Sequence, residues 1–281
     1  MTHFFPGQNE IQNDQSATVP SLYAIFGGTF DPPHLGHLKP LQQTLDLLGI
    51  HNIGLMPANQ PALKSNTTPI QHRLNMTQLL CDLDIRFTVD TTEIDRGGKT
   101  YTVDTLSYLK QQHKSRTLVF IMGLDSIKSI SKWYKWQDLF KYAHLVVMCR
   151  DKCKIPTDDS LIQTTTEQHS SHKTKLASNL YNIYTSERQF HKLMGSEMDE
   201  KTRSLLLSKL ALADKNLSNV YPATIEGILN ESVEGKLWFV NNDLVQISST
   251  EIRLLLKQKQ DISQLVPTSI VDYISKNKLY L

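Results

Sequence analysis

The sequence has almost no excess of charge of either sign and no long apolar run. Its 281 residues include 30 Lys and Arg against 28 Asp and Glu, which gives a formal net charge of +2 at pH 7. A chain so nearly neutral has no global field that would draw it to nucleic acid or to an anionic membrane. No stretch approaches the roughly 20 apolar residues of a transmembrane helix. We therefore expect neither a nucleic acid nor a membrane as a partner.

Cysteine is also scarce. The chain has three, Cys81, Cys149 and Cys153, which are too few for a disulfide framework. Cys149 and Cys153 lack the second pair of ligands that a zinc site needs. We expect buried or unreactive thiols, no metal held by protein ligands alone, and a cytoplasmic location. Residues 1–20 have neither the charged start nor the apolar core of a signal peptide, and they are predicted to form a disordered polar tail.

Short apolar runs alternate with helical patterns from residue 21 onward. The run 117–123 is apolar, as in a strand that is buried on both faces of a parallel sheet. This alternation predicts an α/β fold with a doubly wound, Rossmann-like parallel sheet in a single domain over 21–281. The expected strands are 21–28, 51–58, 86–94, 117–123 and 144–150, and the expected helices are 40–49, 68–83, 100–113 and 133–142.

The alternation stops after Arg150. Residues 151–235 are rich in Ser, Thr, Lys and Gln, with a helical pattern at 202–213. We predict a polar, partly helical insertion at about 151–235, in the simplest interpretation a partly ordered surface segment outside the chemical centre. The strand and helix rhythm resumes at 235–243 and continues with expected helices at 249–258 and 267–276.

Residues 27–37, GGTFDPPHLGH, place two histidines behind a glycine turn. His34 and His37 could be metal ligands, structural caps of the next helix, or donors to a phosphate, and the sequence offers no further ligand cluster for zinc. The stretch follows the first strand, at whose carboxyl end ligands bind in such sheets. Gly27 and Gly28 allow close approach to a ligand, and the helix beginning near Leu35 directs its amides and positive dipole end to the same place. Phosphate is therefore the favoured interpretation.

A second motif, ISSTEIR, occupies residues 247–253. Ser248 followed by Glu251 has the pattern of a capping box, so a helix should begin there. Ser249, Thr250 and the first-turn amides would then converge with Arg253, whose planar guanidinium suits a polyphosphate. Taken alone, the motif is better explained as a capped helix with an exposed arginine.

The glycine spacing fits neither the G-x-G-x-x-G dinucleotide fingerprint nor the P-loop. Instead, GGTFDPPHLGH and ISSTEIR together resemble the signatures of the H-x-G-H nucleotidyltransferase superfamily. Further segments are similar to the bacterial nicotinate-nucleotide adenylyltransferases within it: KTYTVDTL (99–106), MGLDS (122–126) and KWYKW (132–136). The resemblance covers about 21–150 and 236–281. It implies adenylyl transfer from ATP to nicotinate mononucleotide, giving nicotinate adenine dinucleotide and pyrophosphate, in NAD biosynthesis.

The resemblance also assigns site residues. The implied catalytic residues are His34, His37 and Arg253. The implied ATP-binding residues are Gly27, Gly28, Thr29, Phe30, His34, His37, Gly123, Asp125, Ile247, Ser249, Thr250 and Arg253. The implied residues of the nicotinate mononucleotide pocket are Tyr101, Thr102, Trp133 and Tyr134, where an electron-poor ring could stack on an indole. Core packing is the competing explanation for Trp133 and Tyr134.

Several implications concern chemistry and partners. The nucleophile would be a phosphate oxygen that is already mostly ionised at neutral pH, so no general base is needed. Mg²⁺ would arrive with ATP, and a homo-oligomer is left open. Two departures from the family pattern stand out: Ala62 and Leu63 leave Lys64 as the only cation of its loop, and Leu124 replaces a small or polar residue.

Two alternatives to this function remain. The first is a pantetheine-phosphate adenylyltransferase, which usually has Thr where His34 stands and is a shorter chain. The second is a non-catalytic nucleotide-binding module in which 151–235 docks a partner. The intact set of His34, His37 and Arg253 argues against the second.

Overall fold

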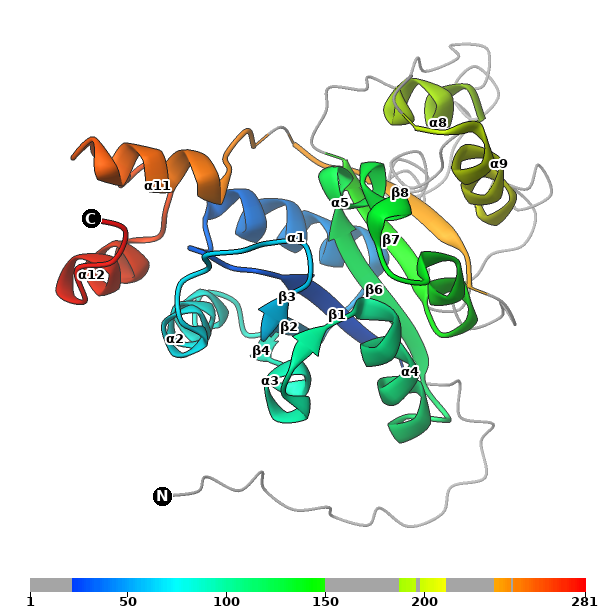
Figure 1. Cartoon of the computed structure of the whole chain (residues 1–281), viewed down its shortest axis with the longest axis horizontal. Coiled ribbons are helices and arrows are strands. Elements are labelled where there is room, and N and C mark those ends of the chain that lie inside the picture. The colour runs from blue at the N-terminus through cyan, green and yellow to red at the C-terminus, as the bar shows by residue number, and fades with distance from the viewer. Residues whose placement is uncertain (1–21, 150–186, 196–197, 211–234, 244) are drawn as a thin grey trace, which may run out of the picture.

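A six-stranded parallel sheet forms the centre of the computed structural model (Figure 1), which describes residues 22–149, 187–195, 198–210, 235–243 and 245–281. The strand order is β4-β2-β1-β6-β7-β8, and every neighbouring pair is parallel. The predicted doubly wound parallel sheet is confirmed. The strands are β1 (Leu22–Gly28), β2 (Ile53–Pro57), β4 (Phe87–Val89), β6 (Thr117–Gly123), β7 (His144–Cys149) and β8 (Leu237–Asn241).

The direction in which the sheet grows reverses between β1 and β6. From β1 the chain adds β2 and β4 on one side, and it then returns to add β6, β7 and β8 on the other side. Phe26 pairs with Ile121, so the carboxyl ends of β1 and β6 lie next to each other. In open parallel sheets this reversal point is where a crevice for ligands forms.

One face of the sheet is covered by α1 (Leu35–Leu48), α2 (Ile70–Cys81), α11 (Ser249–Lys257) and α12 (Thr268–Lys276). Ala24 and Phe26 of β1 belong to this core, whereas Ile25 between them belongs to the core of the opposite face. That division follows from the two-residue period of a strand. The last helix, α12, packs near α2, which brings the end of the chain beside its first third (Figure 1).

The other face is covered by α4 (Thr102–Gln112), α5 (Leu124–Lys128), two short 3₁₀ helices (Ile130–Lys132 and Trp136–Lys141), α8 (Glu187–Met194) and α9 (Glu200–Lys209). Phe190 and Leu206, from α8 and α9, are fully buried, and the Phe190 ring lies 6.0 Å from that of Phe239. The predicted insertion 151–235 is helical in these two stretches, and one side of each helix is buried on the core. Residues 151–186, 196–197 and 211–234 lie outside the described residues.

Some predicted elements differ from the structure in extent or type. The expected strand 86–94 is strand only over β4 and continues as the short helix α3 (Thr92–Arg96). The expected helix 133–142 is the 3₁₀ segment from Trp136, preceded by Lys135 with a positive φ of 46°. The first helix begins at Leu35, as the first motif predicts, so it extends beyond the periodic stretch 40–49 at its start. α9 ends at Lys209, before the predicted 213.

Other sequence-level details are confirmed. Gly49 ends α1 in the left-handed conformation that glycine adopts without strain. Cys81 and Cys149 are buried free thiols, while Cys153 lies outside the described residues. Within the part of the chain that the structure describes, no helix is both long enough and apolar enough to cross a membrane.

Candidate functional site

The loop between β1 and α1 holds both histidines of the first motif close together. His34 is the N-cap of α1 and is 2% exposed, and its ring centroid lies 3.8 Å from that of His37. The His34 amide donates to Nδ1 of His37 at 3.3 Å, which forms a histidine version of the reciprocal capping box. The two histidines therefore do cap the helix, as the second of the three alternatives proposes.

The cap engages only one of the two ring nitrogens of His37, namely Nδ1. Because Nδ1 accepts a hydrogen bond, the neutral ring carries its proton on Nε2, and that nitrogen is a donor. The ring is half-buried and is oriented by Phe30, whose centroid lies 5.3 Å away. One nitrogen can therefore cap the helix while the other donates to an anion.

Close packing explains why position 36, in the H-x-G-H pattern, is a glycine. A Cβ at Gly36 would lie 2.9 Å from His34 Nδ1 and 3.1 Å from the carbonyl oxygen of Ile247. Gly28 is equally restricted, because a Cβ there would meet the ring of Phe30 at 2.8 Å. The first motif therefore packs directly on Ile247, the first residue of the second motif.

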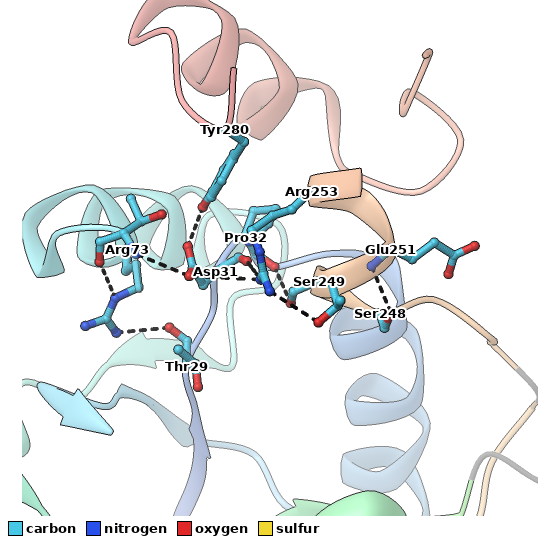
Figure 2. Close-up of polar contacts among 11 residues, drawn as sticks. Thr29, Asp31, Pro32, Arg73, Ser248, Ser249, Glu251, Arg253 and Tyr280 are labelled. Carbon is cyan, nitrogen blue, oxygen red and sulfur yellow. Dashed lines mark hydrogen bonds and ion pairs between the residues drawn. The ribbon is translucent and has the colours of Figure 1, made fainter. Parts of the chain in front are cut away.

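Hydrogen bonds join the two motifs further (Figure 2). Arg253 Nη1 donates to the carbonyl of Asp31 at 2.6 Å, across 222 positions of sequence, and Ser249 Oγ donates to the carbonyl of Pro32 at 2.9 Å. The peptide bond between Asp31 and Pro32 is cis. As predicted, Ser248 caps α11 by accepting from the Glu251 amide at 3.1 Å. Thr250 Oγ1 accepts from Arg253 Nη2 at 3.2 Å, so these residues form one cluster.

One element of the phosphate hypothesis needs correction. The first-turn amides of α1 are not all directed at a ligand, because the Leu35 amide donates to the carbonyl of Leu265 at 2.9 Å. The His37 amide is likewise bonded to the carbonyl of His34 at 2.8 Å. The phosphate hypothesis therefore requires side chains of the loop and of the first turn of α11 to supply contacts that the amides of α1 do not.

The predicted adenosine side lies at the end of β6. Gly123 is the N-cap of α5, and Asp125 in the first turn is exposed. Because β6 pairs with β1 in parallel, both residues lie at the same end of the sheet as Gly27 and Gly28, namely the carboxyl end of the strands. Leu124, one of the two departures from the family pattern, is 7% exposed and belongs to the core. The Leu124 side chain therefore faces the core, whereas Asp125 is exposed to solvent.

Part of the predicted pyridine pocket comes together beside α4. Tyr101 is the N-cap of α4, and its ring centroid lies 4.9 Å from that of Tyr134, whose side chain is 48% exposed. Core packing therefore does not explain Tyr134, whereas Trp133 is half-buried against the core. Thr102 is the first residue of α4. Two ammonium groups lie near the aromatic pair: Lys99 Nζ at 5.9 Å from the Tyr101 ring and Lys135 Nζ at 5.1 Å from the Tyr134 ring.

Comparison with known proteins fits this geometry. The cytidylyltransferase-like family model matches residues 25–255. The chain belongs to the cytidylyltransferase-like family. It is 31% identical to a probable nicotinate-nucleotide adenylyltransferase of Shewanella frigidimarina over 258 residues, covering 91% of this chain and 98% of that protein. It is 30% identical to a protein of the same name from Aeromonas salmonicida, covering 91% and 95%.

Solved structures support the fold of this cytidylyltransferase-like chain. A Plasmodium falciparum nicotinic acid mononucleotide adenylyltransferase, complexed with NaAD, has a TM-score of 0.58 at 20% identity and covers 92% of this chain and 97% of its own. The same enzyme complexed with APC gives 0.56 at 19% identity, with the same coverage. The predicted family and fold are confirmed.

Arg73, which the motifs did not indicate, contacts the loop that carries the first motif. This α2 residue is 1% exposed, and its guanidinium donates to four backbone carbonyls. The acceptors are those of Thr29 at 3.0 Å, Ala58 at 2.6 Å, Asn59 at 2.8 Å and Thr68 at 2.9 Å. Burial lowers its pKa, and the nearby Asp31 carboxylate opposes that shift. Its position on the same helix face as Met76 and Leu80 is the sequence signal that could have revealed it.

Arg73 also links the two halves of the site. Asn59, one of its acceptors, donates from Nδ2 to the carbonyl of Gly98 at 3.0 Å. The neighbouring strands β3 (Gln60–Pro61) and β5 (Lys99–Thr100) pair in a two-stranded sheet. The loop that carries Thr29 is thus connected through Arg73 to the segment just before Tyr101.

Lys64, the only cation left in its loop, lies within the electrostatic reach of this cluster. Loss of hydration lowers the pKa of its ammonium group, repulsion from Arg253 lowers it further, and Asp31 opposes the shift. Among the ranges that the structure describes, no group of three or more His, Cys, Asp and Glu side chains could hold a metal ion.

Glu93 is a buried carboxyl group behind the Tyr101 segment. Its Oε1 accepts from Thr105 Oγ1 at 3.1 Å, and Arg96 Nη1 donates to the same Thr105 oxygen at 2.9 Å. Burial raises the pKa of Glu93 to about 7, although the Thr105 hydrogen bond opposes the shift. Between the ordinary glutamate pKa and about pH 7, the native protein therefore holds a proton at Glu93 that the unfolded chain has released.

This difference predicts a pH-dependent stability. The native state binds the extra proton between the unfolded pKa near ~4.5 and the folded pKa of about 7, so the Glu93 contribution is fully present below that window. It is lost as pH rises to 7, at a cost of up to about 3 kcal/mol. Denaturant unfolding of the wild type and of Glu93→Gln, measured from pH 4 to 8, should give a difference in unfolding free energy that changes in this direction. A difference that does not vary with pH would refute the assignment.

Proposed function

We propose that this chain transfers the adenylyl group of ATP to nicotinate mononucleotide, giving nicotinate adenine dinucleotide and pyrophosphate for NAD biosynthesis. The observation that carries this proposal is the joining of the two motifs at the carboxyl end of β1, through Arg253 and Ser249. Relatives named as probable nicotinate-nucleotide adenylyltransferases, matched over almost their whole length, indicate the acceptor.

The reaction is an in-line displacement at the α-phosphorus of ATP. A phosphate oxygen of the mononucleotide forms the new bond to phosphorus, and the bond to the oxygen bridging the α- and β-phosphates breaks. Pyrophosphate leaves with that electron pair. Because the attacking phosphate is mostly dianionic at neutral pH, the protein needs to position two anions and stabilise charge rather than remove a proton.

The residues of the joined motifs divide this work. His34 and His37 would donate to the α-phosphoryl oxygens, and Arg253 would hold the departing β- and γ-phosphates. The remaining proposed ATP contacts are Gly27, Gly28, Thr29, Phe30, Ile247, Ser249 and Thr250 on the phosphate side, and Gly123 and Asp125 on the adenosine side. Mg²⁺ would enter with ATP and would offset the negative charge of the triphosphate.

The aromatic pair beside α4 would hold the acceptor. The pyridine ring would lie against Tyr101 and Tyr134, with Trp133 and Thr102 at the same place. First-turn amides of a helix have no partner in a preceding turn of that helix, and those of Thr102 and Val103 in α4 would donate to the nicotinate carboxylate. The nearby Lys99 and Lys135 favour an anionic ligand here.

This pocket predicts a preference for the acid over the amide. The carboxamide of nicotinamide mononucleotide would present its N–H groups to backbone amides that are also donors. Each donor left without an acceptor would weaken binding by about 1–3 kcal/mol. We expect kcat/KM for nicotinate mononucleotide to exceed that for the nicotinamide form by roughly tenfold or more. Pyrophosphate release, measured with both mononucleotides and with phosphopantetheine, provides the test.

Each result of that assay favours one function. Equal kcat/KM on the two mononucleotides would contradict the amide pocket but leave adenylyl transfer in place. Turnover with phosphopantetheine alone would establish the alternative adenylyltransferase, against which the presence of His34 argues. ATP binding without pyrophosphate release, whatever the acceptor, would identify a non-catalytic module.

Two further expectations accompany the function. A cytoplasmic location is supported by the three cysteines, two of which are buried free thiols. Self-association into a homo-oligomer is left open by the sequence, and light scattering of the purified chain tests it.

A further inference from the structure

The last residues of the chain reach back to the first motif. After α12 the backbone turns, with the Leu279 amide bonded to the carbonyl of Ile274 at 3.1 Å. Tyr280, the penultimate residue, then donates from its hydroxyl to Oδ1 of Asp31 at 2.7 Å, across 249 positions of sequence (Figure 2). The hydrogen bond is partly buried.

Asp31 is a buried carboxylate beside the arginine of the second motif. Its side chain is 6% exposed, and its Oδ2 lies 4.0 Å from Arg253 Nη1. Arg253 nevertheless makes its short contact, at 2.6 Å, with the backbone carbonyl of Asp31. The carboxylate itself accepts from Tyr280 at Oδ1 and from the Thr68 amide, at 3.2 Å, at Oδ2. Two neutral donors therefore bind the carboxylate at hydrogen-bond distance, whereas the guanidinium of Arg253 stays 4.0 Å from it.

This arrangement matters because carboxylates and phosphates compete for the same partner. An arginine binds either anion through two parallel hydrogen bonds, and a buried carboxylate without other donors would draw it into such a pair. An arginine held in that pair is less available to a phosphate. The two neutral donors satisfy Asp31 without neutralising Arg253.

We propose that Tyr280 is a positioning residue, whose hydroxyl holds the Asp31 carboxylate so that Arg253 stays available to the triphosphate of ATP. The identity of the ligand rests on the proposed function, whereas the contact among the three residues does not. Burial and the neighbouring carboxylate both raise the pKa of Tyr280 above its ordinary value, so the phenol remains a donor at neutral pH.

The hydroxyl can be removed alone. In Tyr280→Phe, Asp31 loses one donor and turns toward Arg253, so the KM for ATP and the dissociation constant of Mg²⁺–ATP should both rise by roughly tenfold. The kcat should stay within about twofold of the wild type, because the histidines that face the α-phosphate are unchanged.

Tyr273→Phe is the matched control. Its hydroxyl also belongs to a half-buried tyrosine near the end of the chain, but it contacts His72 Nδ1 at 2.9 Å and Asn75 Nδ2 at 2.8 Å, both on α2. This variant should leave ATP affinity within about twofold of the wild type. If Tyr273→Phe raises the KM for ATP as much as Tyr280→Phe does, then weaker packing of α12 is enough to weaken ATP binding. That result would overturn the proposal.

Asp31→Asn supplies a second test, because an amide has no charge with which to draw in Arg253. In that background, adding Tyr280→Phe should change the dissociation constant of Mg²⁺–ATP by less than about twofold. An unchanged ATP affinity in Tyr280→Phe alone, or a full effect in the Asp31→Asn background, would refute the proposal.

Calorimetric titration with Mg²⁺–ATP separates this proposal from the proposed function. If the wild type binds ATP but transfers no adenylyl group to any mononucleotide, the proposed function fails while the pattern of dissociation constants still tests Tyr280. If the wild type is an active adenylyltransferase and the pattern is absent, only the role of Tyr280 fails.

Discussion

His37→Ala should lose turnover by roughly 10²–10³-fold, or about 3–4 kcal/mol of transition-state stabilisation, which is the usual effect of removing one preorganised donor to a developing oxyanion. The donor is Nε2, because Nδ1 accepts from the His34 amide. Negative charge on the α-phosphoryl oxygens increases as the bond to pyrophosphate breaks, so the donor contributes most there. ATP affinity should change only modestly.

The cap formed by the same ring makes a second, smaller contribution. Loss of a helix cap typically costs about 1 kcal/mol of stability, so His37→Ala should fold with a slightly lower unfolding free energy. Single-turnover rates with saturating ATP and nicotinate mononucleotide measure the catalytic part, and denaturant unfolding measures the structural part. His51→Ala, at an exposed position preceding β2, is the matched histidine control and should change neither. Near-normal turnover in His37→Ala would leave the cap as the only role of this residue.

The sequence predicted the parts of the fold that depend on local signals. The all-apolar run 117–123, the glycine at position 49 and the Ser248 cap each follow from residues within a few positions, and the structure confirms all three. Residues of the two motifs were predicted to share one site because of a resemblance. The contacts that join them, such as Ile247 against Gly36, are long-range and follow from no local pattern.

The errors have local physical causes as well. The run 86–94 has the β-branched residues of a strand, but Asp90 Oδ1 accepts from the Thr92 amide at 2.9 Å and turns the chain into α3. The Trp-rich segment has helical spacing, but Lys135 adopts a positive φ and delays the helix. The polar neighbours Gln189 and His191 concealed the burial of Phe190.

Arg73 and Asp31 show a different limit of sequence reasoning. A charged residue in an amphipathic helix is usually solvated, and nothing in the sequence near Arg73 says that four carbonyls from three separate segments will surround it. The acceptors of the guanidinium are placed only when β1, β2 and α2 have packed. The same holds for Asp31, whose partners include the penultimate residue of the chain.

Arg73→Met should lower the free energy of unfolding by about 4 kcal/mol or more. Methionine fills most of the volume but supplies no donor, so the carbonyls of Thr29, Ala58, Asn59 and Thr68 lose their partner. Each buried acceptor left unsatisfied costs about 1–3 kcal/mol, and only those that water can reach recover part of this. The burial that already lowers the pKa of Arg73 is the reason that water has little access to replace it.

Urea unfolding with linear extrapolation tests this expectation, with Arg116→Met as the matched control. Arg116 is exposed and its guanidinium lies 5.9 Å from the centroid of the Tyr23 ring, so its replacement should cost less than about 1 kcal/mol. Arg73→Met protein that remains folded should also bind both ATP and the mononucleotide more weakly, because Thr29 and the segment before Tyr101 are joined through this one guanidinium. A loss of stability no larger than that of Arg116→Met would show that the four carbonyls are hydrated without Arg73, and that the two halves of the site are held together by other contacts.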